Sequence, residues 1–207
     1  MAAMTDPPSP AALILADSRF PGGGHVHSGG LEQAVSQGLV SGLDDLAGFL
    51  AGRLRTAGRL AAVFATPAQR AASRAQGRGT ARAALVAWPS PVLADLLAVT
   101  PRPHHAVLVG AVHGSTGGNA GQAALTTAYL AVSGPASAAV RLLGLDPFAV
   151  NAVLARLGPA LTELAAEAAR TAADRPADLP APSSPALDLL AEAHDRHHQQ
   201  EVRLFAS

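Results

Sequence analysis

Apolar side chains recur at three- and four-residue intervals along most of this 207-residue chain. That spacing places them on one side of an α-helix, whereas a half-buried strand would alternate residue by residue. The clearest case begins after Ser41, a residue type that caps helix N-termini, and Asp44 and Asp45 follow in the predicted first turn. The apolar side of this predicted helix is formed by Leu43, Leu46, Leu50, Leu54 and Ala57.

Several shorter stretches show the same periodicity and are bounded by glycine, proline or polar residues. Gly38 is expected to end the first of them, because glycine adopts the left-handed backbone conformation that closes many helices. Helices are therefore predicted at residues 29–37, 67–88, 91–99 and 104–112.

Asn119 is predicted to cap a helix that runs to about Val132. Proline lacks the amide hydrogen that an interior helical residue donates, so Gly134-Pro135 predicts the end of that helix. A second, short helix is then expected through Leu143.

Pro147 stands where the first turn of a long helix is predicted, and Gly158-Pro159 predicts a kink within it. The predicted apolar side consists of Val150, Val153, Leu154, Leu157, Leu161, Leu164 and Ala168.

The composition changes after residue 173. Four prolines between Asp174 and Pro185 predict an extended linker, and residues 186–207 are helical by composition. No strand pattern or internal repeat is found. The sequence therefore predicts an all-α fold, with a single-domain helical bundle at 1–173, a proline-rich linker at 174–185 and a C-terminal tail at 186–207, which either binds a partner or packs on its own domain.

Composition narrows the classes of function. The net charge is +0 and the pI about 7.1, so the chain has no overall basic field to attract nucleic acid. All 15 cationic side chains are arginine, which excludes a P-loop lysine and a lysine nucleophile or base. Cysteine is absent, as is common in a reducing cytosol. Residues 1–10 lack a basic signal-peptide segment, and no apolar run approaches the ~20 residues of a membrane helix. We expect a cytoplasmic protein that binds neither membrane nor nucleic acid.

Eight histidines are the candidate metal ligands. His194, His197 and His198 are spaced to share one side of a helix, and His25 and His27 alternate within a predicted loop. Imidazole binds nickel, copper and zinc, but neither group forms a closed ligand set or an H-E-x-x-H pattern. They remain weak metal candidates, and we predict no tightly bound metal or other cofactor.

The glycine cluster Gly22-Gly23-Gly24 lacks the spacing and the lysine of a phosphate-binding loop. A tight turn is the preferred interpretation, with backbone passing close to another element or with positive φ at Gly22 or Gly23. Ser28 has histidine neighbours but no G-x-S-x-G elbow, so no nucleophilic serine is predicted.

Three groups of motifs resemble the UreF family of urease accessory proteins. The first runs from Leu13-Ile14-Leu15-Ala16-Asp17-Ser18 through Phe20-Pro21-Gly22-Gly23 to His27-Ser28-Gly29-Gly30-Leu31-Glu32-Gln33. The second is Val132-Ser133 followed by Ala138-Ala139-Val140-Arg141-Leu142 and Gly144-Leu145. The third is Asp188-Leu189-Leu190, Arg196-His197 and Arg203-Leu204-Phe205-Ala206-Ser207. Their order and spacing extend the resemblance along nearly the whole chain.

The resemblance implies a helical, non-enzymatic chaperone for nickel insertion into urease. Implied partners are a UreD/UreH-type accessory protein, a UreG-type GTPase and the urease apoprotein, with a homodimer inside the complex and GTP hydrolysis gating nickel release. Partner-binding residues are then expected at Arg141, Arg196, His197, Arg203, Leu204 and Phe205.

Two other classes stay open on the residues alone. A histidine-based metal-binding protein or metalloenzyme would use the histidines above. A helical transcriptional regulator would need an arginine-rich surface, and along the sequence the arginines look scattered and balanced by 15 acidic residues.

Overall fold

A computed structural model describes residues 9–22, 28–60, 67–175 and 178. The described residues form nine helices and no strand, which confirms the all-α prediction. In chain order the helices are α1 (Pro10–Ala16), α2 (Leu31–Ser36), α3 (Leu43–Leu60), α4 (Pro67–Ala87), α5 (Pro91–Val99), α6 (His105–Ser115), α7 (Ala120–Leu143), α8 (Pro147–Arg156) and α9 (Gly158–Arg170).

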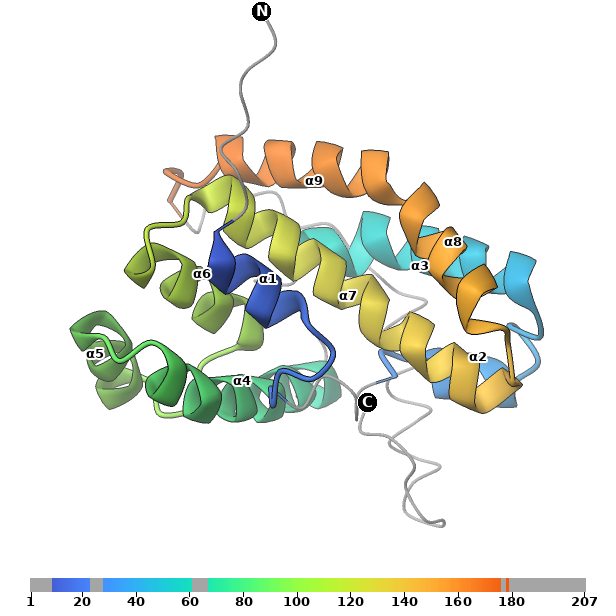
Figure 1. Ribbon diagram of the computed structural model, residues 1–207, viewed down its shortest axis with the longest axis horizontal. Helices are drawn as coiled ribbons and strands as arrows, with labels where there is room; N and C mark the ends of the chain where they lie inside the picture. The colour runs from blue at the N-terminus through green and yellow to red at the C-terminus, as the bar shows by residue number, and fades with distance from the viewer. Residues whose placement is uncertain (1–8, 23–27, 61–66, 176–177, 179–207) are drawn as a thin grey trace, which may run out of the picture.

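Helix α7 is the centre of the bundle, and α1, α2, α3, α6, α8 and α9 all contact it (Figure 1). Two apolar clusters surround it. One joins α2, α3, α8 and α9 to the C-terminal part of α7 around Leu46, Leu50 and Val132. The other joins α1, α4, α5 and α6 around Leu93 and Leu108. The core is therefore two packed groups of helices that share α7 as their common element.

Both ends of α7 are specified locally. The Asn119 side chain accepts a hydrogen bond from the Gln122 amide at 2.9 Å, and the Gln122 side chain accepts from the Asn119 amide at 3.3 Å. This reciprocal pair is a capping box, which confirms Asn119 as the cap. Gly144 closes the helix with φ of +63°, a conformation that glycine adopts without steric cost.

The predicted break at Gly134-Pro135 is wrong, because α7 continues through Pro135 to Leu143. A proline at this position cannot donate to the carbonyl four residues earlier, which belongs to Ala131. Arg53 on α3 supplies the missing donor, since its Nε lies 2.6 Å from the Ala131 carbonyl oxygen. The helix therefore continues because a side chain from a neighbouring helix satisfies the carbonyl that the proline leaves open.

The same guanidinium holds the loop before α2. Arg53 Nη1 donates to the Gly29 carbonyl at 2.6 Å. Gly29 has φ of +61°, and a Cβ at this position would lie 2.6 Å from the guanidinium carbon of Arg53. Glycine is required there on both counts. We call this arrangement, made by Arg53, Gly29, Ala131 and Pro135, the Arg53 clamp.

Other helix boundaries follow local chemistry and correct smaller predictions. Ser41 does not cap α3, which begins at Leu43; its hydroxyl and its amide both donate to the Asp45 carboxylate. The interruption near Gly158-Pro159 is confirmed, but it separates two helices, α8 and α9, at Leu157. Ala168 is exposed, and Ala165 is the buried residue in the last turns of α9.

Length and hydropathy alone would let α7 cross a membrane, and it is the one helix in the described part of the chain that passes this test. The sequence shows no continuous apolar run of this length, because glycine, serine, threonine and proline interrupt the apolar residues of α7. The core helix of a protein without membrane spans passes the same test, and α7 packs against helices on several sides.

The Arg53 clamp predicts a large effect of Arg53→Met on stability. The substitution keeps an apolar stem but leaves two carbonyls without their donor, so it should cost about 2–5 kcal/mol of unfolding free energy. In a Pro135→Ala background the new amide can donate to Ala131, and the cost of Arg53→Met should fall by about 1 kcal/mol. Urea unfolding of the two single variants and the double variant measures this coupling. Arg156→Met, at an exposed position on α8, is the control and should change stability by less than about 0.5 kcal/mol. Strict additivity of Arg53→Met and Pro135→Ala would contradict the clamp.

Candidate partner-binding groove

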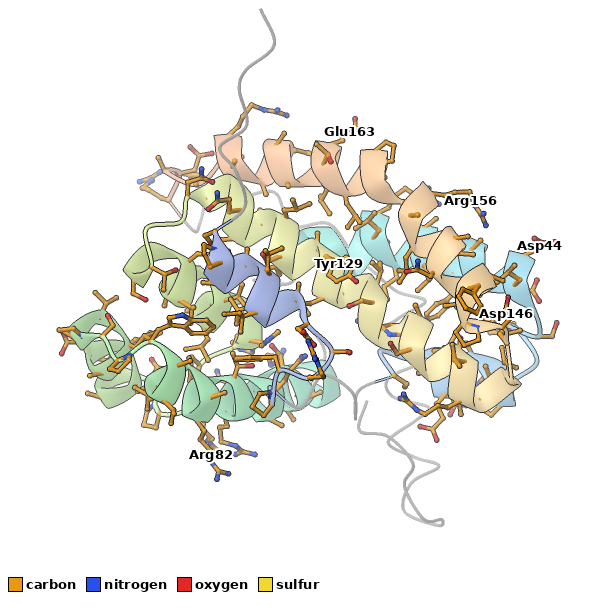
Figure 2. The ribbon with its side chains drawn as sticks, in the orientation of Figure 1. Asp44, Arg82, Tyr129, Asp146, Arg156 and Glu163 are labelled. Carbon is orange, nitrogen blue, oxygen red and sulfur yellow. The ribbon has the colours of Figure 1, made fainter. Side chains whose placement is uncertain are left out.

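A groove of about 700 Å³ lies where α1 and the turn after it meet α4, α6, α7 and α8. It is partly open to solvent, and its volume is in the range of small-molecule sites. Its lining comprises Leu15, Ala16, Asp17, Ser18, Phe20, Gly22, Gln76, Thr80, His105, Tyr129, Leu130, Ser133, Gly134, Ser137, Arg141, Asn151 and Leu154. Figure 2 labels Tyr129 on α7, near the middle of the molecule.

The turn after α1 supplies a fixed charged pair at the groove. The Asp17 carboxylate accepts from Arg19 Nη2 at 2.6 Å and from the Arg19 amide at 2.8 Å. These hydrogen bonds hold the pKa of the Asp17 carboxyl at about 2, and they raise the pKa of Arg19. Asp17 is therefore ionised at neutral pH and can accept hydrogen bonds, but it is a poor proton acceptor in catalysis.

The opposite side of the groove is a polar ridge on α7. Ser133, Ser137 and Arg141 follow one another at four-residue spacing, which aligns them along one side of the helix. Asn151 on α8 continues this polar lining. Ser137, Arg141 and Asn151 are exposed residues of this lining and bring a hydroxyl, a guanidinium and an amide group to it. This is a set of hydrogen-bonding groups suited to holding a polypeptide segment.

The third side is formed by close approach of two backbones. A Cβ at Gly22 would lie 2.7 Å from Thr80 Oγ1, and a Cβ at Gly79 would lie 2.9 Å from the Gly22 carbonyl oxygen. The tight-turn interpretation is thus confirmed for Gly22, with close approach as the cause, since Gly22 is not among the positive-φ glycines. Beside this contact Phe20 stacks on Trp88, with 6.1 Å between the centroids of the two rings.

Within the described residues no group of three or more His, Asp or Glu side chains could hold a metal ion. His113 is buried in α6, its Nε2 lies 3.1 Å from Thr126 Oγ1, and burial lowers its pKa. It is a core histidine rather than a ligand at the groove.

Only part of the predicted site falls on described residues. Arg141 is exposed on α7 and lines the groove. His25, His27, His194, His197, His198, Arg196, Arg203, Leu204 and Phe205 lie outside the described residues, as does most of the 174–185 linker and the whole 186–207 tail.

The groove brings the first two sequence motifs together. Ala16, Asp17 and Ser18 come from the N-terminal motif, whereas Ser133 and Arg141 come from the motif more than a hundred residues later. Residues separated this far in the chain line one surface because α1 packs directly against α7. The residues of the two motifs therefore lie close together in the fold, although they are far apart in the sequence.

Comparisons with known proteins decide the family. A sequence model of UreF matches residues 50–158, which is more than half of the chain. Urease accessory protein UreF of Mycobacterium sp. (strain JLS) is 44% identical, with 94% of this chain and 97% of the relative covered. UreF of Mycolicibacterium vanbaalenii is 43% identical with the same coverage, and UreF of Mycobacterium tuberculosis (strain H37Rv) is 40% identical over 88% of this chain and 92% of the relative. The chain belongs to the UreF family of urease accessory proteins.

UreF membership confirms the resemblance predicted from the motifs, and the matched region contains the structural centre of the molecule. Residues 50–158 include Arg53 and Pro135 of the clamp and Arg141 of the groove. Sequence reasoning missed Arg53, Thr80 and Asn151. Arg53 and Thr80 stand in stretches without a recognisable motif, and only the fold shows what they touch.

The Gly22–Thr80 contact predicts that Gly22→Ala destabilises the fold. Overlap with Thr80 should cost about 1–3 kcal/mol, because a closely packed site has little room to relax. Removing the obstructing oxygen with Thr80→Ala in the same chain should recover at least half of that cost. Gly48→Ala is the matched control; no atom lies within 4 Å of its added Cβ, so it should be neutral or stabilising by up to about 1 kcal/mol. Thermal unfolding of the four proteins provides the measurement, and an unaffected Gly22→Ala protein would contradict the close-approach reading.

Proposed function

We propose that this UreF-family protein is a non-catalytic scaffold for nickel insertion into urease. In this role it bridges a UreD/UreH-type accessory protein and a UreG-type GTPase on the urease apoprotein, and it regulates GTP-dependent nickel delivery in the cytoplasm. The observation that carries the proposal is similarity over 94% of this chain and 97% of a urease accessory protein. Coverage of both chains supports transfer of the role of the whole protein.

The groove supports a scaffold role through its chemistry. Its lining offers hydroxyls, an amide, an ionised carboxylate paired with Arg19 and the guanidinium of the exposed residue Arg141. Such groups bind and orient a protein segment, whereas catalysis requires a nucleophile or a base in hydrogen-bond reach of a reacting atom. We therefore assign the groove to partner binding. We also propose that two copies of this chain form a homodimer within the assembly.

The C-terminal segment is the second proposed contact. Leu204 and Phe205 are adjacent apolar residues in a stretch otherwise rich in charge and amide, and Arg203 precedes them. Two such anchors buried on a partner contribute roughly 3–6 kcal/mol before ordering costs, enough to decide a micromolar complex. Arg196 and His197 complete this proposed surface for the UreD/UreH-type partner.

Urease activation tests the proposed function directly. In a host that carries the urease operon but lacks only this gene, the intact protein should restore urease activity with nickel supplied. The purified protein should hydrolyse neither urea nor GTP, and its histidines should bind nickel no tighter than micromolar, about −8 kcal/mol. Failure to restore activity, or turnover by the purified protein, would overturn the proposal.

Arg141→Glu tests whether the groove, rather than another part of the surface, binds a partner. Reversal of this exposed charge leaves the core untouched, so the melting temperature should stay within a few degrees, whereas urease activation should fall about tenfold or more. Arg156→Glu is the matched control on α8 and should activate like the parent. Equal activity of the two variants would remove Arg141 from the partner surface.

Removal of residues 196–207 tests the tail. The shortened protein should keep the helical signal and cooperative unfolding but lose capture of the UreD/UreH-type partner, and Leu204→Ala with Phe205→Ala should reproduce the loss. Replacement of Gln199 and Gln200 by alanine is the control within the same segment. Full-strength capture by the shortened protein would show that the tail is not the contact.

A further inference from the structure

Helix α4 carries a one-signed charge. Its 21 residues include Arg70, Arg74, Arg78 and Arg82 and no acidic residue. The four arginines follow one another at intervals of four, so neighbouring turns of the helix present like charges to each other. Like charges at this spacing destabilise an isolated helix by about 0.2–0.5 kcal/mol per pair. Helix α9, by contrast, mixes Glu163 and Glu167 with a single arginine.

The fold leaves this charge on one outward side of α4. Gly77, Thr80, Ala81 and Ala84 are buried against the bundle, with Gly77 in contact with the Pro103 carbonyl. Arg70, Arg74, Arg78 and Arg82 are all exposed, and Figure 2 shows Arg82 projecting from α4 away from the bundle. From Arg74 to Arg82 the row covers about 12 Å of helix axis. Arginines that look scattered along the sequence thus gather on one surface.

Within the described part of the chain, Arg78 and Arg82 form no ion pair with a carboxylate. The ion pairs there include Asp17 with Arg19 and Arg175 with Asp178, and neither of these involves α4. Arg74 Nη1 donates to the Arg102 carbonyl, a neutral acceptor, at 2.9 Å. The pKa of His104 is lowered by burial and then by the charges of Arg74 and Arg70, as expected beside a positive surface.

An apolar edge continues the row at its C-terminal end. Val86 follows Arg82 by four residues and is 83% exposed, and Leu85 beside it is 40% exposed. Val92, at the start of α5, is also exposed. Protein interfaces are enriched in arginine and have an apolar core, whereas a nucleic-acid surface combines a basic stripe with a basic domain, commonly of pI above about 9. A chain with net charge +0 does not have that domain-wide character.

We propose that Arg74, Arg78 and Arg82, with Leu85 and Val86 at their end, form a docking surface for a carboxylate-rich protein surface that carries its own apolar edge. The inference rests on the proposed function, because the partner is a component of the urease-maturation assembly. Arginine suits this role, since its planar guanidinium forms two parallel hydrogen bonds with one carboxylate. The surface lies on α4 and is separate from the polar α7 ridge of the groove.

Charge reversal with a salt series tests the inference. The full chain is immobilised, and binding of the UreD/UreH-type protein, the UreG-type GTPase and the urease apoprotein is measured singly and together, from about 50 to about 300 mM NaCl. Arg78→Glu with Arg82→Glu should weaken at least one of these complexes about tenfold or more and flatten its salt dependence. Arg156→Glu with Arg170→Glu makes the same change in net charge from exposed positions on α8 and α9, and should bind like the parent.

Each other outcome overturns the inference in a distinguishable way. Unchanged binding of the α4 variant, or equal loss in both variants, overturns the docking surface while the proposed function stands. A parent protein that binds no component overturns both. Parent binding to a random DNA duplex of about 20 base pairs as tight as binding to the assembly, lost in the α4 variant, assigns the surface to nucleic acid. A change confined to self-association assigns it to a second copy. If the glutamate variant does not fold, Arg78→Gln with Arg82→Gln gives the same comparison without new charge.

Discussion

One guanidinium group holds the architecture together. Arg53 donates from α3 to a carbonyl of α7 and to a carbonyl of the loop before α2, each at 2.6 Å. Burial lowers its pKa to about 10, so it remains charged at neutral pH and makes charge-assisted hydrogen bonds to both carbonyls. The first carbonyl is the one that Pro135 leaves without a donor. The central helix can therefore contain a proline and still extend unbroken between the two halves of the core.

The proposed partner-binding ridge on α7 depends on that continuity. The polar ridge of Ser133, Ser137 and Arg141 spans Pro135, so a break at that residue would separate its first member from the other two. The ridge faces the turn after α1, whose Asp17–Arg19 pair is fixed by its own hydrogen bonds. On another side of the bundle, α4 turns its small residues inward and its arginines outward. The protein thus presents two chemically distinct surfaces, one of mixed hydrogen-bonding groups and one positive.

Helix periodicity and caps made much of the fold predictable. Leu46, Leu50 and Leu54 are buried as their spacing indicated, and Asn119 caps α7. The continuity of α7 through Pro135 was not predictable, because the missing donor comes from Arg53, 78 positions before the carbonyl that it binds. Local patterns report hydrogen bonds within an element and carry no information about a side chain that arrives from another helix.

The sequence motifs were enough to predict the family, but they did not predict the geometry of the groove. The motifs correctly indicated the family and drew attention to Arg141, but their convergence on one groove follows from the packing of α1 on α7. Gly22 was correctly assigned to a tight turn, although the contact that requires glycine there is with Thr80 on a helix without a motif. Along the sequence the α4 arginines look scattered and balanced by acidic residues elsewhere, and only the geometry of the helix shows that they share a surface.

Proton exchange at Arg53 Nε tests the central claim most directly. In the clamp this N–H donates to a carbonyl between packed helices, so NMR at neutral pH should show a separate, slowly exchanging Arg53 Hε resonance. Arg82, which projects into solvent, is the internal reference and should exchange rapidly. We predict protection of Arg53 Hε by at least about a hundredfold over Arg82, because exchange requires an opening that costs roughly 3 kcal/mol or more. Exchange of the two protons at the same rate would contradict the clamp and the continuity of α7 that rests on it.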